Sequence, residues 1–238
     1  MLQASSVEVP LSAYLRVLEC LVTKRIGQGK FIAKFERKVC KLFGMKHCIA
    51  TSNGTQADLT MLIALSEMYP DHKEVIMPAL TFPAQSNAVL MAGLIPVFLE
   101  VTDNFVIDWN LVHPNENTLC FFPTHLLGFS AEIPKDIIDG KISVLEDCCE
   151  AMLGYDKDGL FGTRGIAGAF SMFPSHLITT GEGGFIITNN DSFASVCRKI
   201  INHGKIGSDF DFSPFGTNSK WTNLSAAIGC SVIGKAEE

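Results

Sequence analysis

The segment TSNGTQADL, residues 51–59, places small polar side chains where an apolar run gives way to a helical pattern. In such a turn Gly54, Thr55 and Gln56 offer backbone N–H groups and a hydroxyl at a helix N-terminus, where a phosphate group binds favourably. Any turn from a strand into a helix also needs a capping residue, and this segment taken alone is more typical of such a cap. It becomes a candidate phosphate site only together with other segments.

A second segment, VLEDCCEA at residues 144–151, carries two carboxylates directly after an apolar run. Open α/β sheets bind ligands at the carboxyl ends of their strands, so these carboxylates are candidates for a binding site. The alternative is a solvated loop or a helix cap.

A third segment, residues 170–188, contains Ser171, Ser175, His176 and the glycine-rich turn 181–184 between two apolar runs. A lone histidine is more often structural than catalytic. A histidine in a loop rich in Gly, Ser and Thr, however, lies where functional residues concentrate. His176 is therefore a candidate for moving protons near neutral pH.

The elements that must position these segments are short apolar, β-branched runs that alternate with helical patterns. Such runs are typical of strands buried on both faces, so the sequence predicts an α/β fold with three α/β/α layers and a mainly parallel sheet. Further helices are expected over residues 11–24, 32–43, 192–201 and 223–235, the second ending at Gly44. We expect one domain over 1–238, with 1–26 as a helical lead-in, and a further C-terminal domain outside this sequence.

Composition excludes several classes of protein. The 238 residues are 47% hydrophobic and carry 19 Lys+Arg against 25 Asp+Glu, with no long basic block, so a nucleic-acid partner is not expected. The longest apolar stretch, residues 88–99, is too short and too interrupted to span a membrane. No secretory leader is recognisable, so we expect a soluble, cytoplasmic protein. The mean hydropathy of +0.24 suggests a surface covered by a partner subunit or a missing domain.

Eight cysteines occur without any C-x-x-C spacing, mostly inside apolar runs, which is typical of reduced, buried thiols. The adjacent Cys148 and Cys149 could be redox-active or bind a metal, but no partners stand at ligand spacing. Core packing is the favoured interpretation for both, and no metal site is predicted.

Taken in order and spacing, these segments resemble the DegT/DnrJ/StrS family of sugar aminotransferases, which are pyridoxal-phosphate enzymes of fold type I. The resemblance runs from about residue 27 to 238. It includes the blocks GQGKFIAKFE, SNGTQA, EVIMPALTFPAQSNAVLMAGLIPVFLEV, HLLG, EDCCEA, SMFPSH with TTGEGG, and GTNSKWTNLSAAIG.

The resemblance implies a role for each matching residue. Phe82 matches the aromatic ring that stacks on the pyridine, and Asp147 matches the carboxylate that pairs with the pyridine nitrogen and keeps it protonated. Glu150 stands where aminotransferases usually have a neutral side chain, and we expect it to line the site. Asn218 matches an amide that reaches the cofactor phosphate of a neighbouring subunit, which implies a homodimer. The expected phosphate ligands are Gly54, Thr55, Gln56 and Ser171.

One position departs from the aminotransferase pattern. In the run SMFPSH, His176 stands where the family has the lysine that forms a Schiff base, and no lysine occurs between Lys157 and Arg198. Imidazole forms no stable Schiff base, but it can still transfer protons. The same replacement, followed by a TGEGG-like segment, marks a branch that removes the 3-hydroxyl from nucleotide-linked 4-keto-6-deoxy sugars, and the sequence resembles this branch.

For that branch the resemblance implies that pyridoxamine phosphate joins the sugar ketone, that His176 removes a proton from the cofactor methylene, and that the C3 hydroxyl leaves. Glutamate is the expected amino donor. An iron–sulfur cluster of the kind some members use is not expected, because no cysteine lies between Cys197 and Cys230. Two alternatives stay open: an aminotransferase for nucleotide-linked 4-keto sugars, and a catalytically inactive, truncated family member.

Overall fold

The computed structural model describes residues 9–205, 212 and 215–235. Its centre is a seven-stranded sheet in the order β1-β9-β8-β5-β4-β2-β3, with a separate two-stranded hairpin, β6-β7. The strands are β1 (His47–Thr51), β2 (Glu74–Pro78), β3 (Ile95–Leu99), β4 (Thr118–Phe121), β5 (Ser143–Asp147), β6 (Tyr155–Asp156), β7 (Gly159–Leu160), β8 (Ala167–Ser171) and β9 (Gly184–Thr188). The helices are α1 (Leu11–Val22), α2 (Lys30–Phe43), α3 (Gly54–Met68), α4 (Pro83–Met91), α5 (Lys135–Ile138), α6 (Asp191–Ile200) and α7 (Asn223–Lys235), with 3₁₀ turns η1 (Trp109–Leu111) and η2 (Leu126–Gly128).

The sheet is mainly parallel, as the alternation of strands and helices predicts. Strands β3, β2, β4, β5 and β8 pair in parallel, whereas β9 is antiparallel to both of its neighbours, β8 and β1. The reversal follows from the connection before β9, because residues 172–183 return directly from β8 without a helical crossover. This short return loop carries the candidate histidine.

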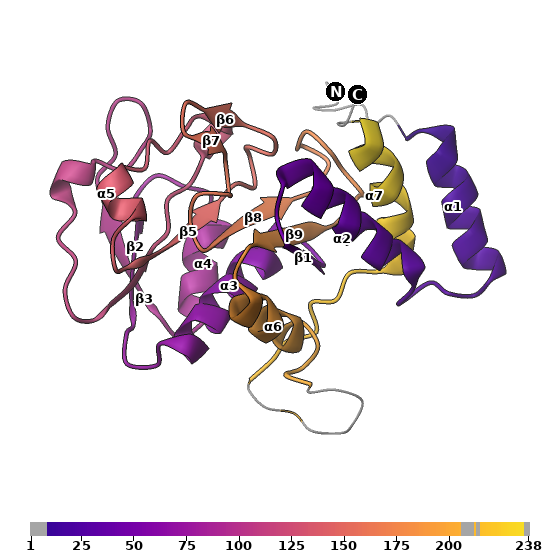
Figure 1. The fold of residues 1–238 in the computed structure, drawn as a ribbon, viewed down its shortest axis with the longest axis horizontal. Helices are drawn as coiled ribbons and strands as arrows, with labels where there is room; N and C mark the ends of the chain where they lie inside the picture. The colour runs from indigo at the N-terminus through magenta and orange to yellow at the C-terminus, as the bar shows by residue number, and fades with distance from the viewer. Residues whose placement is uncertain (1–8, 206–211, 213–214, 236–238) are drawn as a thin grey trace.

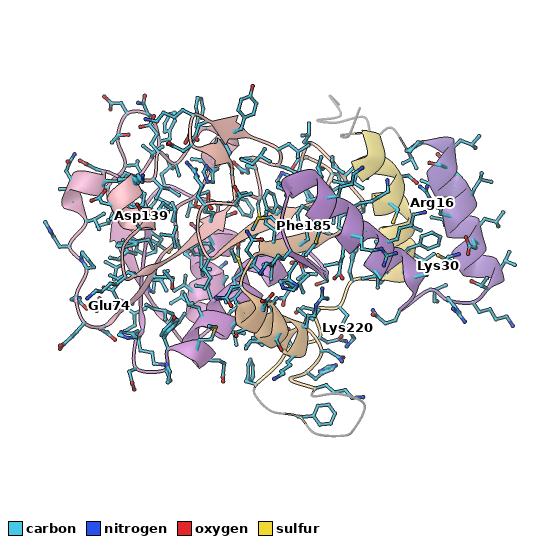
Figure 2. The ribbon with its side chains drawn as sticks, viewed as in Figure 1. Arg16, Lys30, Glu74, Asp139, Phe185 and Lys220 are labelled. Carbon is cyan, nitrogen blue, oxygen red and sulfur yellow. The ribbon has the colours of Figure 1, made fainter. Side chains whose placement is uncertain are left out.

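Helices cover the sheet on both faces, which confirms the predicted three layers (Figure 1). Side chains of α3, α4 and α6 form one buried cluster, and α2 and α7 contribute to a second cluster on the opposite face. In the second cluster the Phe185 ring stacks on Phe170, with 4.8 Å between centroids, and meets the Phe35 ring edge-on. Figure 2 shows Phe185 beneath α2. The sheet is therefore buried on both faces where it supports β5 and β8.

Helix α1 packs on α7 and contributes Cys20 to the second buried cluster. Its Arg16 donates to Ser231, and its small inner face buries Ala13 and Cys20. The outer face leaves several large apolar side chains exposed, namely Leu11, Leu15, Leu18 and Val22. In the part of the chain that the structure describes, no helix is long and apolar enough to cross a membrane.

The helix bounds agree with the sequence-based expectations to within about two residues, except that an additional short helix, α5, was not expected. Helix α2 ends at Gly44, whose φ of +66° is the left-handed conformation that such a cap requires. All eight cysteines are free, and six of them are buried.

Candidate functional site

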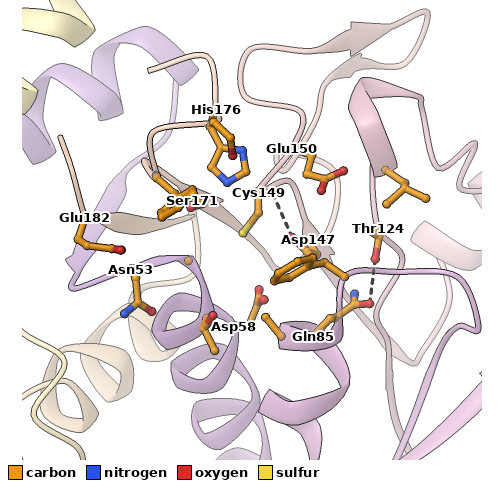
Figure 3. A pocket seen from close by; sticks show the side chains of 17 residues that line it. Asn53, Asp58, Gln85, Thr124, Asp147, Cys149, Glu150, Ser171, His176 and Glu182 are labelled. Carbon is orange, nitrogen blue, oxygen red and sulfur yellow. Dashed lines mark hydrogen bonds between the residues drawn. The ribbon is translucent and has the colours of Figure 1, made fainter. Parts of the chain in front are cut away.

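A cavity of about 420 Å³ opens at the carboxyl ends of the central strands, where α3 and α4 begin (Figure 3). This is the edge at which an open α/β sheet binds ligands. Eight of the residues singled out from the sequence line this cavity: Gly54, Thr55, Phe82, Asp147, Glu150, Ser171, Ser175 and His176.

The turn before α3 packs closely against Ser171 and Cys149. The Asn53 Oδ1 atom accepts the Gln56 N–H at 2.9 Å and so caps the helix. A Cβ atom on Gly54 would lie 2.7 Å from Ser171 Cβ and 2.8 Å from Cys149 Sγ, so that only glycine fits. The N–H groups of Gly54 and Thr55 have no acceptor among the described residues. Together with the Ser171 hydroxyl they can bind an anion.

Gln56 and Asn218 do not line this cavity. The N–H of Gln56 is used by the Asn53 cap, and its Oε1 atom accepts a hydrogen bond from Ser219 at 2.5 Å. Asn218 is exposed and forms an isolated β-bridge with Asn202. Neither side chain therefore contributes a contact to the cavity within a single subunit.

Phe82 offers a flat apolar surface at the cavity. It caps α4 at the N-terminus, with Pro83 as the first helical residue, and is 64% exposed. Beneath it, buried Gln85 donates from Nε2 to the Phe122 carbonyl at 3.0 Å and accepts from the Thr124 hydroxyl at 2.9 Å. These bonds fix the start of α4 against the end of β4, and they give the exposed ring a rigid base.

Asp147 is the last residue of β5 and is 4% exposed at the cavity floor. Its Oδ1 atom accepts the Cys149 N–H at 3.0 Å. Burial raises the pKa of Asp147, hydrogen bonds from Cys149 oppose the rise, and Glu150 adds to it. A protonated ring nitrogen is a suitable partner for a carboxylate in this position, since its positive charge would neutralise the buried carboxylate.

His176 lies in the loop between β8 and β9, across the cavity from α3 (Figure 3). The backbone N–H of His176 donates to the Phe173 carbonyl at 3.0 Å. Gly181, with a φ of +83°, turns the loop back toward β9. Burial lowers the pKa of His176 from its ordinary value, and the Glu150 carboxylate raises it by less. The imidazole is therefore largely neutral at pH 7 and can accept a proton.

Glu150 interacts electrostatically with His176 and forms a hydrogen bond with the turn η2. Its Oε2 atom accepts the N–H of Leu127, which has a positive φ of 52° in the turn η2. The carboxylate is thus held at the cavity, where it shifts the pKa values of both Asp147 and His176.

Several lining residues were not identified from the sequence: Asn53, Asp58, Gln85, Thr124, Cys149, Phe173 and Glu182. Asp58 had a detectable signal, because it is a carboxylate next to the mainly apolar run 59–65 of α3. The interpretation of Cys149 as a core residue was wrong. Cys148 is packed in the core, but the chain turns at the end of β5 and brings Cys149 to the cavity.

Comparisons with known proteins identify the family of the chain. The DegT/DnrJ/EryC1/StrS aminotransferase family matches residues 12–238. A GDP-perosamine synthase from Caulobacter vibrioides is 34% identical over 235 residues, which are 93% of this chain and 62% of the relative. The solved structure of PseC, a Helicobacter pylori aminotransferase of pseudaminic acid biosynthesis, superposes with a TM-score of 0.90 at 28% identity, covering 99% of this chain and 66% of that one.

A second solved structure is the E. coli GDP-4-keto-6-deoxy-D-mannose-3-dehydratase with bound hydrated PLP. It superposes with a TM-score of 0.87 at 27% identity and covers 98% of this chain and 67% of that one. The chain spans less than two thirds of the length of the curated relative described above. The fold is that of these enzymes, and the chain belongs to the DegT/DnrJ/EryC1/StrS aminotransferase family.

Proposed function

We propose that the protein binds pyridoxal or pyridoxamine 5′-phosphate in this cavity. The donor set fits such a group: free N–H groups of Gly54 and Thr55 with the Ser171 hydroxyl for the phosphate, and Asp147 for the ring nitrogen. The exposed Phe82 ring would stack on the pyridine. When bound, the cofactor supplies an electron sink that stabilises negative charge on a neighbouring carbon.

We further propose that the reaction is removal of the C3 hydroxyl from a nucleotide-linked 4-keto-6-deoxyhexose. One observation carries this proposal: the cavity has His176 and no lysine among its described lining residues. A neutral imidazole at this place can take a proton on a ring nitrogen and return it to the departing hydroxyl. It cannot hold the cofactor covalently, as a lysine would.

The neighbouring carboxylates support the same assignment. Glu150 raises the pKa of His176 against the larger effect of burial, which helps the imidazole to keep a proton that it has accepted. Asp147 would keep the ring nitrogen of the cofactor protonated. Glutamate is the proposed amino donor that restores the cofactor.

The second candidate is an aminotransferase acting on a nucleotide-linked 4-keto sugar. The similarity to a GDP-perosamine synthase and to PseC favours it. It would require a different group to perform the work of the lysine, because His176 cannot form the same bond.

Product analysis separates the two candidates. We expect the chain, with pyridoxamine phosphate, glutamate and a GDP- or dTDP-linked 4-keto-6-deoxyhexose, to release a 3-deoxy sugar that mass spectrometry detects. His176→Asn should lower this rate by roughly 10²–10⁴-fold while cofactor binding is retained. His113→Asn, which changes an exposed histidine that does not line the cavity, is the matched control. A 4-amino product that keeps its 3-hydroxyl would instead support the aminotransferase.

A covalent trap gives an independent test. Borohydride should leave the cofactor removable from the wild type, whereas in His176→Lys it should fix the cofactor to the new lysine. Covalent fixation in the wild type would contradict the assigned site.

A homodimer and a cytoplasmic location stay predictions.

The homodimer is supported by the charges in the cavity. The cavity is lined by four carboxylates and by no lysine or arginine among the described residues, so a bound phosphate lacks a cationic partner within one subunit. Residues from a second subunit, with Asn218 at the interface, would complete the site. Light scattering of the chain at micromolar concentration tests the dimer.

A further inference from the structure

Asp58 is a buried carboxylic side chain with an unpartnered oxygen. It lies one helical turn after Gly54 on α3, is 2% exposed, and its Oδ1 atom has no hydrogen-bond partner among the described residues. It lines the same cavity as Asp147, and Figure 3 shows it on the α3 side, below Cys149 and Asp147. The cofactor contacts proposed above make no use of it.

Asp58 is close enough to Asp147 for the two charges to interact strongly. One oxygen of each carboxyl group and the Cys149 sulfur lie within 4.8 Å of one another. Two ionised carboxylates at such a separation repel in a buried site, and a single proton on one of them removes the repulsion. The described lining of the cavity offers no lysine or arginine to neutralise a second negative charge.

The surroundings decide which carboxyl group keeps the proton. Burial raises the pKa of Asp58 well above its ordinary value, and Asp147 raises it further. The pKa of Asp147 is raised by burial and by Glu150, but hydrogen bonds from Cys149 lower it. Helix α3 packs against α4, α6, β1, β8 and β9. Among the described residues, none of these elements contributes a charged group that shifts the pKa of Asp58. The proton therefore favours Asp58, which has no donors.

We propose that Asp58 is a neutral carboxylic acid in the folded protein and forms, with ionised Asp147, a carboxyl pair that holds one proton and one negative charge. Asp58 is then a positioning residue. Because Asp58 holds the proton, Asp147 is the single anionic partner for a cationic ring nitrogen at the cavity floor. The ligand part of this inference rests on the proposed function, whereas the protonation of Asp58 does not.

Infrared spectroscopy of the ligand-free chain tests the protonation directly. At neutral pH we expect a C=O stretching band of a protonated carboxyl group in the wild type, and its loss in Asp58→Asn. Thr60→Val is the matched control, because Thr60 is also buried on α3 with an unpartnered oxygen but does not line the cavity. Absence of the band from the wild type, or its persistence in Asp58→Asn, would overturn the proposal.

A second measurement needs no variant, and so it does not depend on Asp58→Asn folding. In the unsubstituted chain with ¹³C-labelled aspartate carboxyls, one resonance should keep the chemical shift of a protonated acid at neutral pH. If every aspartate resonance has the shift of an ionised carboxylate, the proposal is wrong.

The affinity for pyridoxamine phosphate separates this inference from the proposed function. Since Asn is as neutral as a protonated Asp, Asp58→Asn should change the dissociation constant by less than about threefold at neutral pH. A loss of about tenfold or more would show that an ionised Asp58 had contributed to binding, and would overturn the proposal. If the wild type binds no pyridoxamine phosphate, the proposed function fails, and the infrared result still decides the state of Asp58.

Discussion

Glu146 and Asp147 are neighbours on β5, yet their carboxyl groups have opposite environments. Glu146 is fully buried on one side of the strand, and it accepts hydrogen bonds from the N–H groups of Gly162, Arg164 and Gly165. Asp147 faces the cavity, where Cys149 is its donor. Because successive strand residues point to opposite faces, a single step along the chain separates a carboxylate that stabilises the fold from one that is available to a ligand.

The histidine beside Glu146 completes the contrast. His125 Nδ1 accepts the N–H of Ala131 at 3.1 Å, so its proton lies on Nε2 and is donated to Glu146 at 3.1 Å. Burial alone would raise the pKa of Glu146, but the bond from His125 and the further donors around it lower the pKa below the ordinary value. The donors around Glu146 thus lower its pKa and keep it ionised at neutral pH, whereas Asp147 retains a raised pKa.

The largest expected effect is on stability. Glu146→Gln removes the charge that the surrounding N–H groups and Arg164 Nε, at 3.5 Å, compensate. Breaking a buried ion pair of this kind costs about 3–5 kcal/mol, so we expect a loss of that order in the free energy of unfolding, measured by urea denaturation. A loss below about 1 kcal/mol would contradict the structural role given to Glu146.

Asp147→Asn should have the complementary effect. The amide oxygen can still accept the Cys149 N–H, so the unfolding free energy should stay constant or rise. Affinity for pyridoxamine phosphate should fall by roughly 10–100-fold, because a charge-assisted hydrogen bond is worth about 1.5–3 kcal/mol. Equilibrium dialysis measures the affinity, and Glu146→Gln, assayed where it is folded, should bind as the wild type does.

The two carboxylates should also give opposite pH dependences of stability. The pKa of Glu146 in the folded state is lowered from 4.5. Its contribution to stability is therefore present above pH 4.5 and is lost as the pH falls through the folded pKa. The folded pKa of Asp147 is raised from 3.8, so its favourable contribution is present below pH 3.8 and is lost as the pH rises through the folded value.

Thermal denaturation of the variants across pH 3–8 checks this difference. The deficit of Glu146→Gln against the wild type should shrink below pH 4.5, and any advantage of Asp147→Asn should grow above pH 3.8. Parallel curves for the two variants would show that the environments do not differ as described.

The smallest expected effect concerns Glu150. Its carboxylate raises the pKa of His176, so Glu150→Gln should move the acid limb of the pH–rate profile to lower pH, by less than about one unit. The limb itself should lie below pH 6.5, the ordinary value for this group. Glutamine can still accept the Leu127 N–H, which limits structural changes. A shift to higher pH would contradict the assignment.

Local patterns were sufficient to predict much of the fold. The runs that became β1, β2 and β5 are apolar and bounded by polar residues, and the cap before α3 lies in the predicted turn. The reversed direction of β9 could not be predicted, because it depends on how the loop 172–183 returns to the sheet and not on the residues of the strand. Helix α3, apolar on nearly all sides, has no periodicity that would identify the face directed at the cavity.

The sequence by itself determined which chemical groups exist: a histidine in the loop that follows the SMFP run, an aspartate at the end of an apolar strand, and a glycine in a turn that only glycine fits. Tertiary structure alone decided which of these groups meet. Asp58 and Asp147 are far apart in the chain, and their approach depends on the packing of α3 against the sheet. The state of each carboxyl group follows from burial and from the donors around it, neither of which a residue type specifies.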